Sequence, residues 1–142
     1  MDVEGAAAIS IDCGLKVHQA LGPGLLESAY EAVMFHSLQK RGLAVERQKL
    51  IPIRFDDLII DDGFRADLVV EGKLLIELKS IERLSSVHGK QVLTYLRFME
   101  LPIGLLMNFG ADTFREGLRR IVNRHDNTSS STLRINQQQP QS

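Results

Sequence analysis

GFRADLVVEGKLLIELKS, residues 63–80, consists of two short apolar runs joined by Glu-Gly-Lys, and this pattern predicts an antiparallel β-hairpin. Three charged side chains, Asp67, Glu77 and Lys79, interrupt the apolar runs. Glu77 and Lys79 are two positions apart, so they project from the same face of their strand. Because a charge on a core strand is unfavourable unless it is paired or bound to a metal ion, these three residues require an explanation.

The connection between the two strands decides whether the three charges lie together. A two-residue turn at residues 71–72 would place Asp67 opposite Ile76 and on the other side of the sheet from Glu77. A three-residue connection, or one β-bulge, would bring Asp67, Glu77 and Lys79 to one face. We therefore expect one of these two features if the three residues form a site. The alternative explanation is a structural ion pair of Lys79 with Asp67 or Glu77.

Two carboxylates and an ammonium group on one face suit the metal-assisted hydrolysis of a phosphodiester. Asp67 and Glu77 are predicted to hold a hard divalent cation, Mg²⁺ with Mn²⁺ as a substitute, because such ions favour oxygen ligands. The ion neutralises charge on the phosphate and lowers the pKa of a bound water. Lys79 is predicted to stabilise the developing negative charge or to position that water.

The chain as a whole is predicted to form an α/β domain over residues 1–124, followed by a tail. We expect helices over residues 4–21, 25–41, 87–99 and 114–123, and strands over 49–55, 58–61, 64–70, 74–81 and 103–109. The order ααββββαβα is typical of a central sheet covered by helices. Residues 125–142 are rich in Ser and Gln, lack the apolar side chains needed for a core, and are predicted to be disordered.

Composition excludes several classes of protein. The 142 residues are 44% hydrophobic and 25% charged, which is ordinary for a globular domain and excludes fibrous and wholly disordered chains. The single cysteine, Cys13, excludes a disulfide framework and a metal site built from cysteine pairs. The longest stretch without Asp, Glu, Lys or Arg, residues 101–111, is too short to span a bilayer, and the N-terminus does not read as a signal peptide. We therefore expect a cytoplasmic protein without a membrane partner.

The charge balance bears on nucleic-acid binding. The chain has 17 basic and 18 acidic side chains and a net charge of −1, which argues against a general nucleic-acid coat protein. A local basic groove stays open, since residues 39–54 and 115–124 are both locally rich in Lys and Arg.

Several motifs resemble those of one nuclease superfamily. Asp67 followed by Glu77-Leu78-Lys79 resembles the signature of the PD-(D/E)XK nucleases, with Ala66 in place of the usual proline. Residues 24–30, GLLESAY, are similar to the GxxExxY motif that names a small family within that superfamily. The segments VHQALGPGLLESAYE, GFRADLVVEGKLLIELKS and VHGKQVLTYLRF follow in that family's order, and the resemblance covers residues 4–123. It implies a restriction-endonuclease-like α/β fold with a mixed central sheet flanked by helices.

The resemblance also implies further site residues. An acidic residue from an early helix often joins the site in this superfamily, and Glu27 is its counterpart here, as a further metal ligand. The alternative for Glu27 is a first-turn glutamate favoured by the helix dipole. Gln91 and Tyr95 are four positions apart and share a helix face. They resemble the QxxxY element that lies next to the acidic cluster in exonuclease-like members, which implies a role for both in the catalytic site.

The expected function is that of a Mg²⁺-dependent nuclease hydrolysing phosphodiester bonds of nucleic acid, with DNA favoured over RNA. A domain this small has little surface for reading sequence, so a homodimer or a protein partner is expected to contribute specificity. One alternative is a non-catalytic module that keeps the fold and binds nucleic acid or protein. Another is a phosphohydrolase acting on small nucleotides, which would need a closed pocket.

Overall fold

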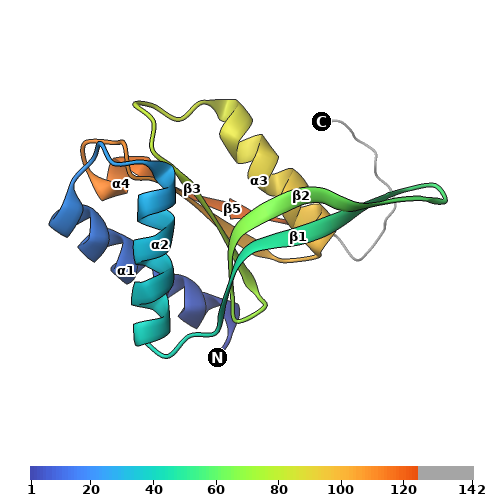
Figure 1. Cartoon of the computed structure of the whole chain (residues 1–142), viewed down its shortest axis with the longest axis horizontal. Coiled ribbons are helices and arrows are strands. Elements are labelled where there is room, and N and C mark those ends of the chain that lie inside the picture. The colour runs from blue at the N-terminus through green and yellow to red at the C-terminus, as the bar shows by residue number, and fades with distance from the viewer. Residues whose placement is uncertain (125–142) are drawn as a thin grey trace.

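The computed structural model describes residues 1–124, in which a five-stranded sheet is flanked by helices (Figure 1). The strands lie in the sheet in chain order: β1 (Val45–Phe55), β2 (Leu58–Val70), β3 (Leu74–Lys79), β4 (Ile103–Asn108) and β5 (Leu118–Val122). β3 and β4 are parallel, and the other neighbours are antiparallel. The expected mixed central sheet flanked by helices is therefore confirmed. The predicted tail, residues 125–142, lies outside the described residues.

Helices cover both faces of the sheet. α1 (Val3–Leu21) and α2 (Glu27–Lys40) enclose the larger hydrophobic core on one face, and α3 (Ser86–Met99) encloses a smaller core on the other. The central strands β3 and β4 are buried on both faces, which explains their nearly continuous apolar sequences. Within residues 1–124, each helix is either too short or too polar to cross a membrane.

The C-terminal part of the fold differs from the prediction. The predicted helix over residues 114–123 is wrong beyond its first turn, because α4 is only Phe114–Gly117 and the chain continues as β5. β5 pairs antiparallel with β4, whose six residues are all buried. Without this partner, the main-chain groups of β4 would be left unpaired inside the protein, and that requirement outweighs local helix propensity.

The β1–β2 hairpin is longer than predicted. The two strands predicted over 58–61 and 64–70 are one continuous strand, β2, and β1 begins at Val45 instead of residue 49. β1 and β2 extend past the other strands as a two-stranded arm (Figure 1). We call residues 54–62 the arm, because each of these nine residues is exposed.

Candidate active site

The hairpin between β2 and β3 has the connection that the sequence required. Val70 pairs with Leu74, so three residues, 71–73, join the strands. Glu71 and Gly72 both take positive φ angles, 56° and 65°, which completes the tight reversal. This register brings Asp67 opposite Glu77, and the expected three-residue connection is confirmed.

Asp67 and Glu77 hold the two strands together through their side chains. Main-chain pairing of β2 with β3 ends at Leu68 and Ile76. Beyond that point the Asp67 amide donates to Glu77 Oε2 at 2.8 Å, and the Leu78 amide donates to Asp67 Oδ2 at 2.8 Å. Each carboxylate is thus oriented by the backbone of the opposite strand where the two strands begin to separate.

Both carboxyl groups are perturbed by this location. Burial raises the pKa of Glu77 to about 8, and the nearby charge of Asp67 adds to the effect. Burial also raises the pKa of Asp67, opposed by the hydrogen bond from the Leu78 amide. Two adjacent acids that resist ionisation are typical of a site that binds a cation or performs acid–base chemistry.

Lys79 lies beside these acids without being tied to one of them. Its positive charge opposes the rise in the pKa of Glu27, Asp67 and Glu77 that burial causes, which places the ammonium group near all three. Within residues 1–124, Lys79 forms no ion pair and no side-chain hydrogen bond. The structural ion pair considered as the alternative explanation is therefore not formed among the described residues.

Glu27, the acid predicted from α2, lies at the exposed first position of the helix. Partial desolvation raises the pKa of Glu27, Lys79 opposes this shift, and Asp67 and Glu31 add to it. Glu27 therefore lies within electrostatic reach of the strand residues, on the rim of the site.

A second acid of α2, Glu31, was not among the predicted site residues. Its side chain is buried, with 7% of its surface exposed, and it accepts hydrogen bonds from Arg47 Nε at 3.1 Å and from Gln48 Nε2 at 2.5 Å. Gln48 also donates to Asp67 Oδ1 at 3.3 Å, so it bridges the acids of α2 and β2. One indication of a role for Glu31 was present in the sequence, because this residue is four positions after Glu27 and therefore lies on the same helix face.

The two predicted residues of α3 differ in their placement. The Tyr95 ring stacks on Phe64, with 3.9 Å between the ring centroids, and is partly buried. Burial raises the pKa of Tyr95, and Glu77 and Asp67 raise it further, so its hydroxyl lies near the two acids. Gln91 is exposed one turn earlier and makes no side-chain hydrogen bond within residues 1–124.

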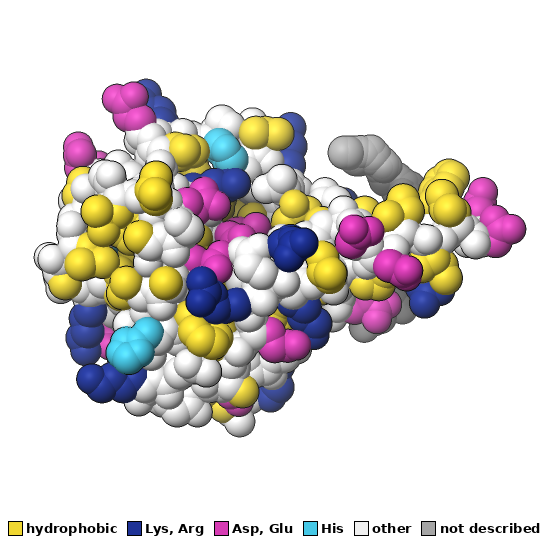
Figure 2. All heavy atoms as spheres, viewed as in Figure 1, with side chains coloured by type: hydrophobic (Ala, Val, Ile, Leu, Met, Phe, Trp, Pro, Cys, Tyr) yellow, Lys and Arg dark blue, Asp and Glu magenta, His cyan; other side chains and the backbone are white. Residues whose placement is uncertain are grey.

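The site therefore lies between α2 and α3, and Figure 2 shows acidic side chains gathered on this part of the surface with basic ones beside them.

The donor set fits a magnesium-like ion. Asp67 and Glu77 offer hard carboxylate oxygens, and Mg²⁺ is commonly held by one or two carboxylates while it keeps several waters. No group of three or more His, Cys, Asp or Glu residues in the described part of the chain forms a ready-made metal cage. The acids that could share a cation are therefore Asp67 and Glu77, and Glu27 and Glu31 lie within electrostatic reach of this pair.

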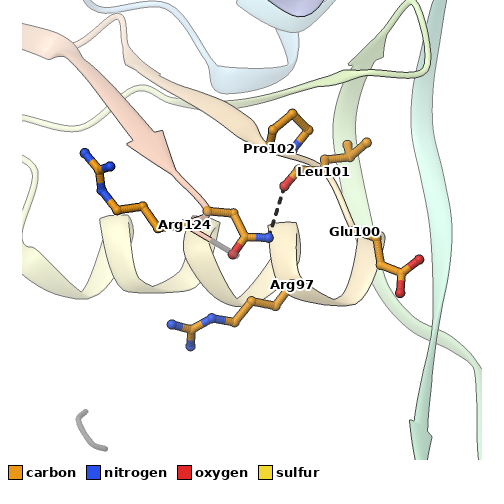
Figure 3. A pocket seen from close by; sticks show the side chains of 6 residues that line it. Arg97, Glu100, Leu101, Pro102 and Arg124 are labelled. Atoms are coloured by element: carbon orange, nitrogen blue, oxygen red, sulfur yellow. Dashed lines mark hydrogen bonds between the residues drawn. The ribbon is translucent and has the colours of Figure 1, made fainter. Parts of the chain in front are cut away.

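Another hollow of the surface lies away from these acids. A pocket of about 500 Å³ is found where α3 ends and β4 begins, and Arg97 and Arg124 are among its lining residues (Figure 3). Asn123 donates to the Leu101 carbonyl oxygen at 3.2 Å within it. None of the predicted site residues lines this pocket.

Comparison with known proteins gives a family for the chain. Residues 5–121 match the family model described as the PD-(D/E)XK nuclease superfamily, so the match includes every predicted site residue. No curated protein and no solved structure gives a significant match. The mixed sheet flanked by helices agrees with the restriction-endonuclease-like fold that this superfamily implies. With most of its length matched in this way, the chain belongs to the PD-(D/E)XK nuclease superfamily.

Proposed function

We propose that this protein is a metal-dependent nuclease that hydrolyses phosphodiester bonds in DNA, with Mg²⁺ as its ion, and that it is a GxxExxY-type member of its superfamily. The observation that carries the proposal is the oriented Asp67–Glu77 pair with the unpaired Lys79 beside it. A purely structural charge cluster is expected to pair its lysine with an acid, whereas this arrangement leaves the ammonium group free for an anionic substrate.

Each site residue has a distinct proposed role. Asp67 and Glu77 would hold the divalent ion, with Glu27 or Glu31 completing its acidic surroundings. The bound ion would neutralise phosphate charge and lower the pKa of a coordinated water. Lys79 would donate to a phosphate oxygen or to the attacking water, which stabilises the charge that develops in the transition state. Tyr95 and Gln91, both on α3, would contact the substrate backbone.

The backbone hydrogen bonds support this assignment because they fix the carboxylates in advance. The amides of Asp67 and Leu78 each bind one oxygen of the opposite acid, so little side-chain freedom remains to be lost when the ion binds. Gln48 restrains the other oxygen of Asp67. A cytoplasmic location is part of the proposal, since the single cysteine is buried and unpaired, as suits a reducing compartment.

A cleavage assay tests the proposed activity. Purified protein is incubated with Mg²⁺ or Mn²⁺ and with single-stranded, duplex and branched DNA, and with RNA. We expect metal-dependent cleavage of DNA by the wild type and its loss in Glu77→Ala and Lys79→Met. The matched controls are Glu82→Ala and Lys90→Met, which change exposed residues of the same types outside the site.

Two results of this assay would contradict the proposal in whole or in part. If the wild type is inert on every substrate and Mg²⁺ neither binds nor raises the melting temperature, the nuclease proposal is wrong. The non-catalytic module then remains. Cleavage of RNA alone would retain the metal site and overturn the proposed preference for DNA.

A further inference from the structure

The arm presents an apolar face that nothing in the described chain covers. Phe55 pairs with Leu58 and Ile53 with Ile60, so these four side chains project from one face of the ribbon. Phe55 is 70% exposed, Leu58 55% and Ile60 43%. A two-stranded ribbon that leaves such a face in water is unfavourable, which indicates a surface that becomes buried in a complex.

The charge of the arm excludes one class of partner. Four of its nine residues are aspartates, Asp56 and Asp57 at the turn and Asp61 and Asp62 further along β2, against the single basic residue Arg54. Figure 2 shows acidic side chains at the end of the arm with hydrophobic ones next to them. Acidic residues at the tip would repel the phosphates of a nucleic acid. The arm therefore fits a partner surface that is apolar and bordered by cations.

The chain itself has such a surface. A groove of about 510 Å³ lies between α1 and α2, and its apolar lining includes Val17, Leu21 and Val33. Lys16, Lys40 and Arg41 also line it. Asp12 pairs with Lys16 at 3.0 Å and with Arg41 at 2.8 Å, so the cations at the groove outnumber the nearby acid.

The arm and the groove are far apart on one copy. Figure 1 shows the arm projecting from the side of the molecule away from α1 and α2, so the arm does not fill the groove of its own chain. A second copy offers the groove at a surface that the first copy's arm can reach. If two copies insert their arms reciprocally about a two-fold axis, the exchange closes the assembly as a dimer, whereas a one-way contact would give an open chain.

We propose that this protein forms a homodimer in which the arm of each copy docks into the α1–α2 groove of the other. Phe55, Leu58 and Ile60 supply the apolar contact, and the aspartates at the turn face Lys40 and its basic neighbours. The proposal requires neither metal binding nor catalysis, so it stands or fails independently of the nuclease assignment.

The molar mass in solution, measured by light scattering after gel filtration over a range of concentrations, is the first test. The wild type is expected to reach twice the 15.9 kDa of one chain. The arm variant Phe55→Ser/Leu58→Ser and the groove variant Leu21→Asp/Lys40→Glu are each expected to be monomers. Val87→Ser, which removes an apolar side chain that is 62% exposed outside both surfaces, is expected to dimerise like the wild type.

Mixing the two variants distinguishes this dimer from other assemblies. The groove variant keeps its arm and the arm variant keeps its groove, so a mixture regains one arm–groove contact and is expected to form heterodimers. A wild type that stays monomeric at every concentration overturns the proposal. So does a groove variant that dimerises as well as the wild type, because the arm would then be packing on another surface, such as a second arm.

A cross-linking experiment reports the contact directly. In a Cys13→Ala background, one copy carries Leu58→Cys on the arm and another carries Ser37→Cys in the groove. Oxidation of the mixture is expected to join residue 58 to residue 37 between copies, as identified by mass spectrometry of the linked peptides. Linkage of residue 58 only to residue 58 would contradict docking into the groove.

Discussion

Glu77 accepts a hydrogen bond from the main-chain amide of Asp67, with N···Oε2 at 2.8 Å, in a position where burial raises the pKa of Glu77 to about 8. The protein therefore positions this carboxyl group by a main-chain bond while making its ionisation unfavourable. A cation that joins this group would offset the cost of its burial and favour its charged form. The consequences are measurable without any knowledge of the substrate.

The first prediction concerns stability in the absence of metal. The pKa of Glu77 is about 8 in the folded protein and 4.5 in the unfolded chain, so between these values the folded state binds more protons. The free energy of unfolding therefore falls as the pH rises from 4.5 to about 8, by at most about 1.4 kcal/mol per pH unit. Glu77→Gln is expected to remove this slope and to be the more stable protein near pH 8.

The slope is measured by urea denaturation in the presence of a chelator across this pH range. Glu82→Gln, a change at an exposed glutamate, serves as the control and is expected to keep the slope of the wild type. Equal slopes for the wild type and Glu77→Gln would show that the Glu77 carboxyl is not the titrating group.

The second prediction concerns the addition of metal. Mg²⁺ is expected to raise the melting temperature of the wild type and to release a proton on binding at neutral pH, since Glu77 must ionise to act as a ligand. Calorimetry in buffers of different ionisation enthalpy measures the proton count. Asp67→Asn is expected to lose the thermal shift. Binding without proton release would mean that the ion does not engage Glu77.

The hairpin and its three charged residues could be predicted from the sequence because their signals are local. Strand alternation placed Glu77 and Lys79 on one face, and the length of the connection then determined where Asp67 lies. Glu31 and Gln48 could not be found in this way. They meet only because α2 packs beside β1, which in turn pairs with β2, and Gln48 takes a φ of 49° that no sequence pattern indicated.

The last part of the fold was mispredicted for a related reason. The segment that forms α4 and β5 has no strong strand pattern, and only the buried β4 beside it determines the extended conformation. Contacts between segments distant in the sequence therefore determine both of these features: the extended conformation of β5 at the edge of the sheet, and the meeting of Glu31 on α2 with Gln48 on β1.

The third prediction concerns Gln48, which bridges Glu31 and Asp67. Gln48→Gly removes the side-chain amide, and glycine adopts the positive φ of this position without strain. The variant therefore measures the loss of the bridge without an added backbone effect. Loss of an outer contact of this kind is expected to weaken Mg²⁺ affinity about 10- to 100-fold. Gln48→Asn keeps a side-chain amide and tolerates positive φ, so its loss of Mg²⁺ affinity is expected to be smaller. Unchanged affinity in Gln48→Gly would show that the bridge does not position Asp67.

The fourth prediction concerns Tyr30, the tyrosine of the GLLESAY motif. Its ring is fully buried and stacks on Phe109, while its hydroxyl donates to the Gly22 carbonyl at 2.5 Å and accepts from the Leu25 amide at 3.2 Å. The tyrosine therefore closes the turn that leads into α2 and to Glu27. Tyr30→Phe keeps the packing and removes both hydrogen bonds, so it is expected to lower the free energy of unfolding by about 1–3 kcal/mol.

Tyr95→Phe provides a matched control, because the Tyr95 hydroxyl makes no hydrogen bond within residues 1–124 and its ring stacks on Phe64. It is expected to leave the unfolding free energy nearly unchanged, as measured by urea denaturation. If Tyr30→Phe is as stable as Tyr95→Phe, the tyrosine of the motif acts through its ring alone. Because the Tyr30 hydroxyl fixes the entry to α2, the Tyr30→Phe variant is also expected to weaken Mg²⁺ binding if Glu27 is a ligand.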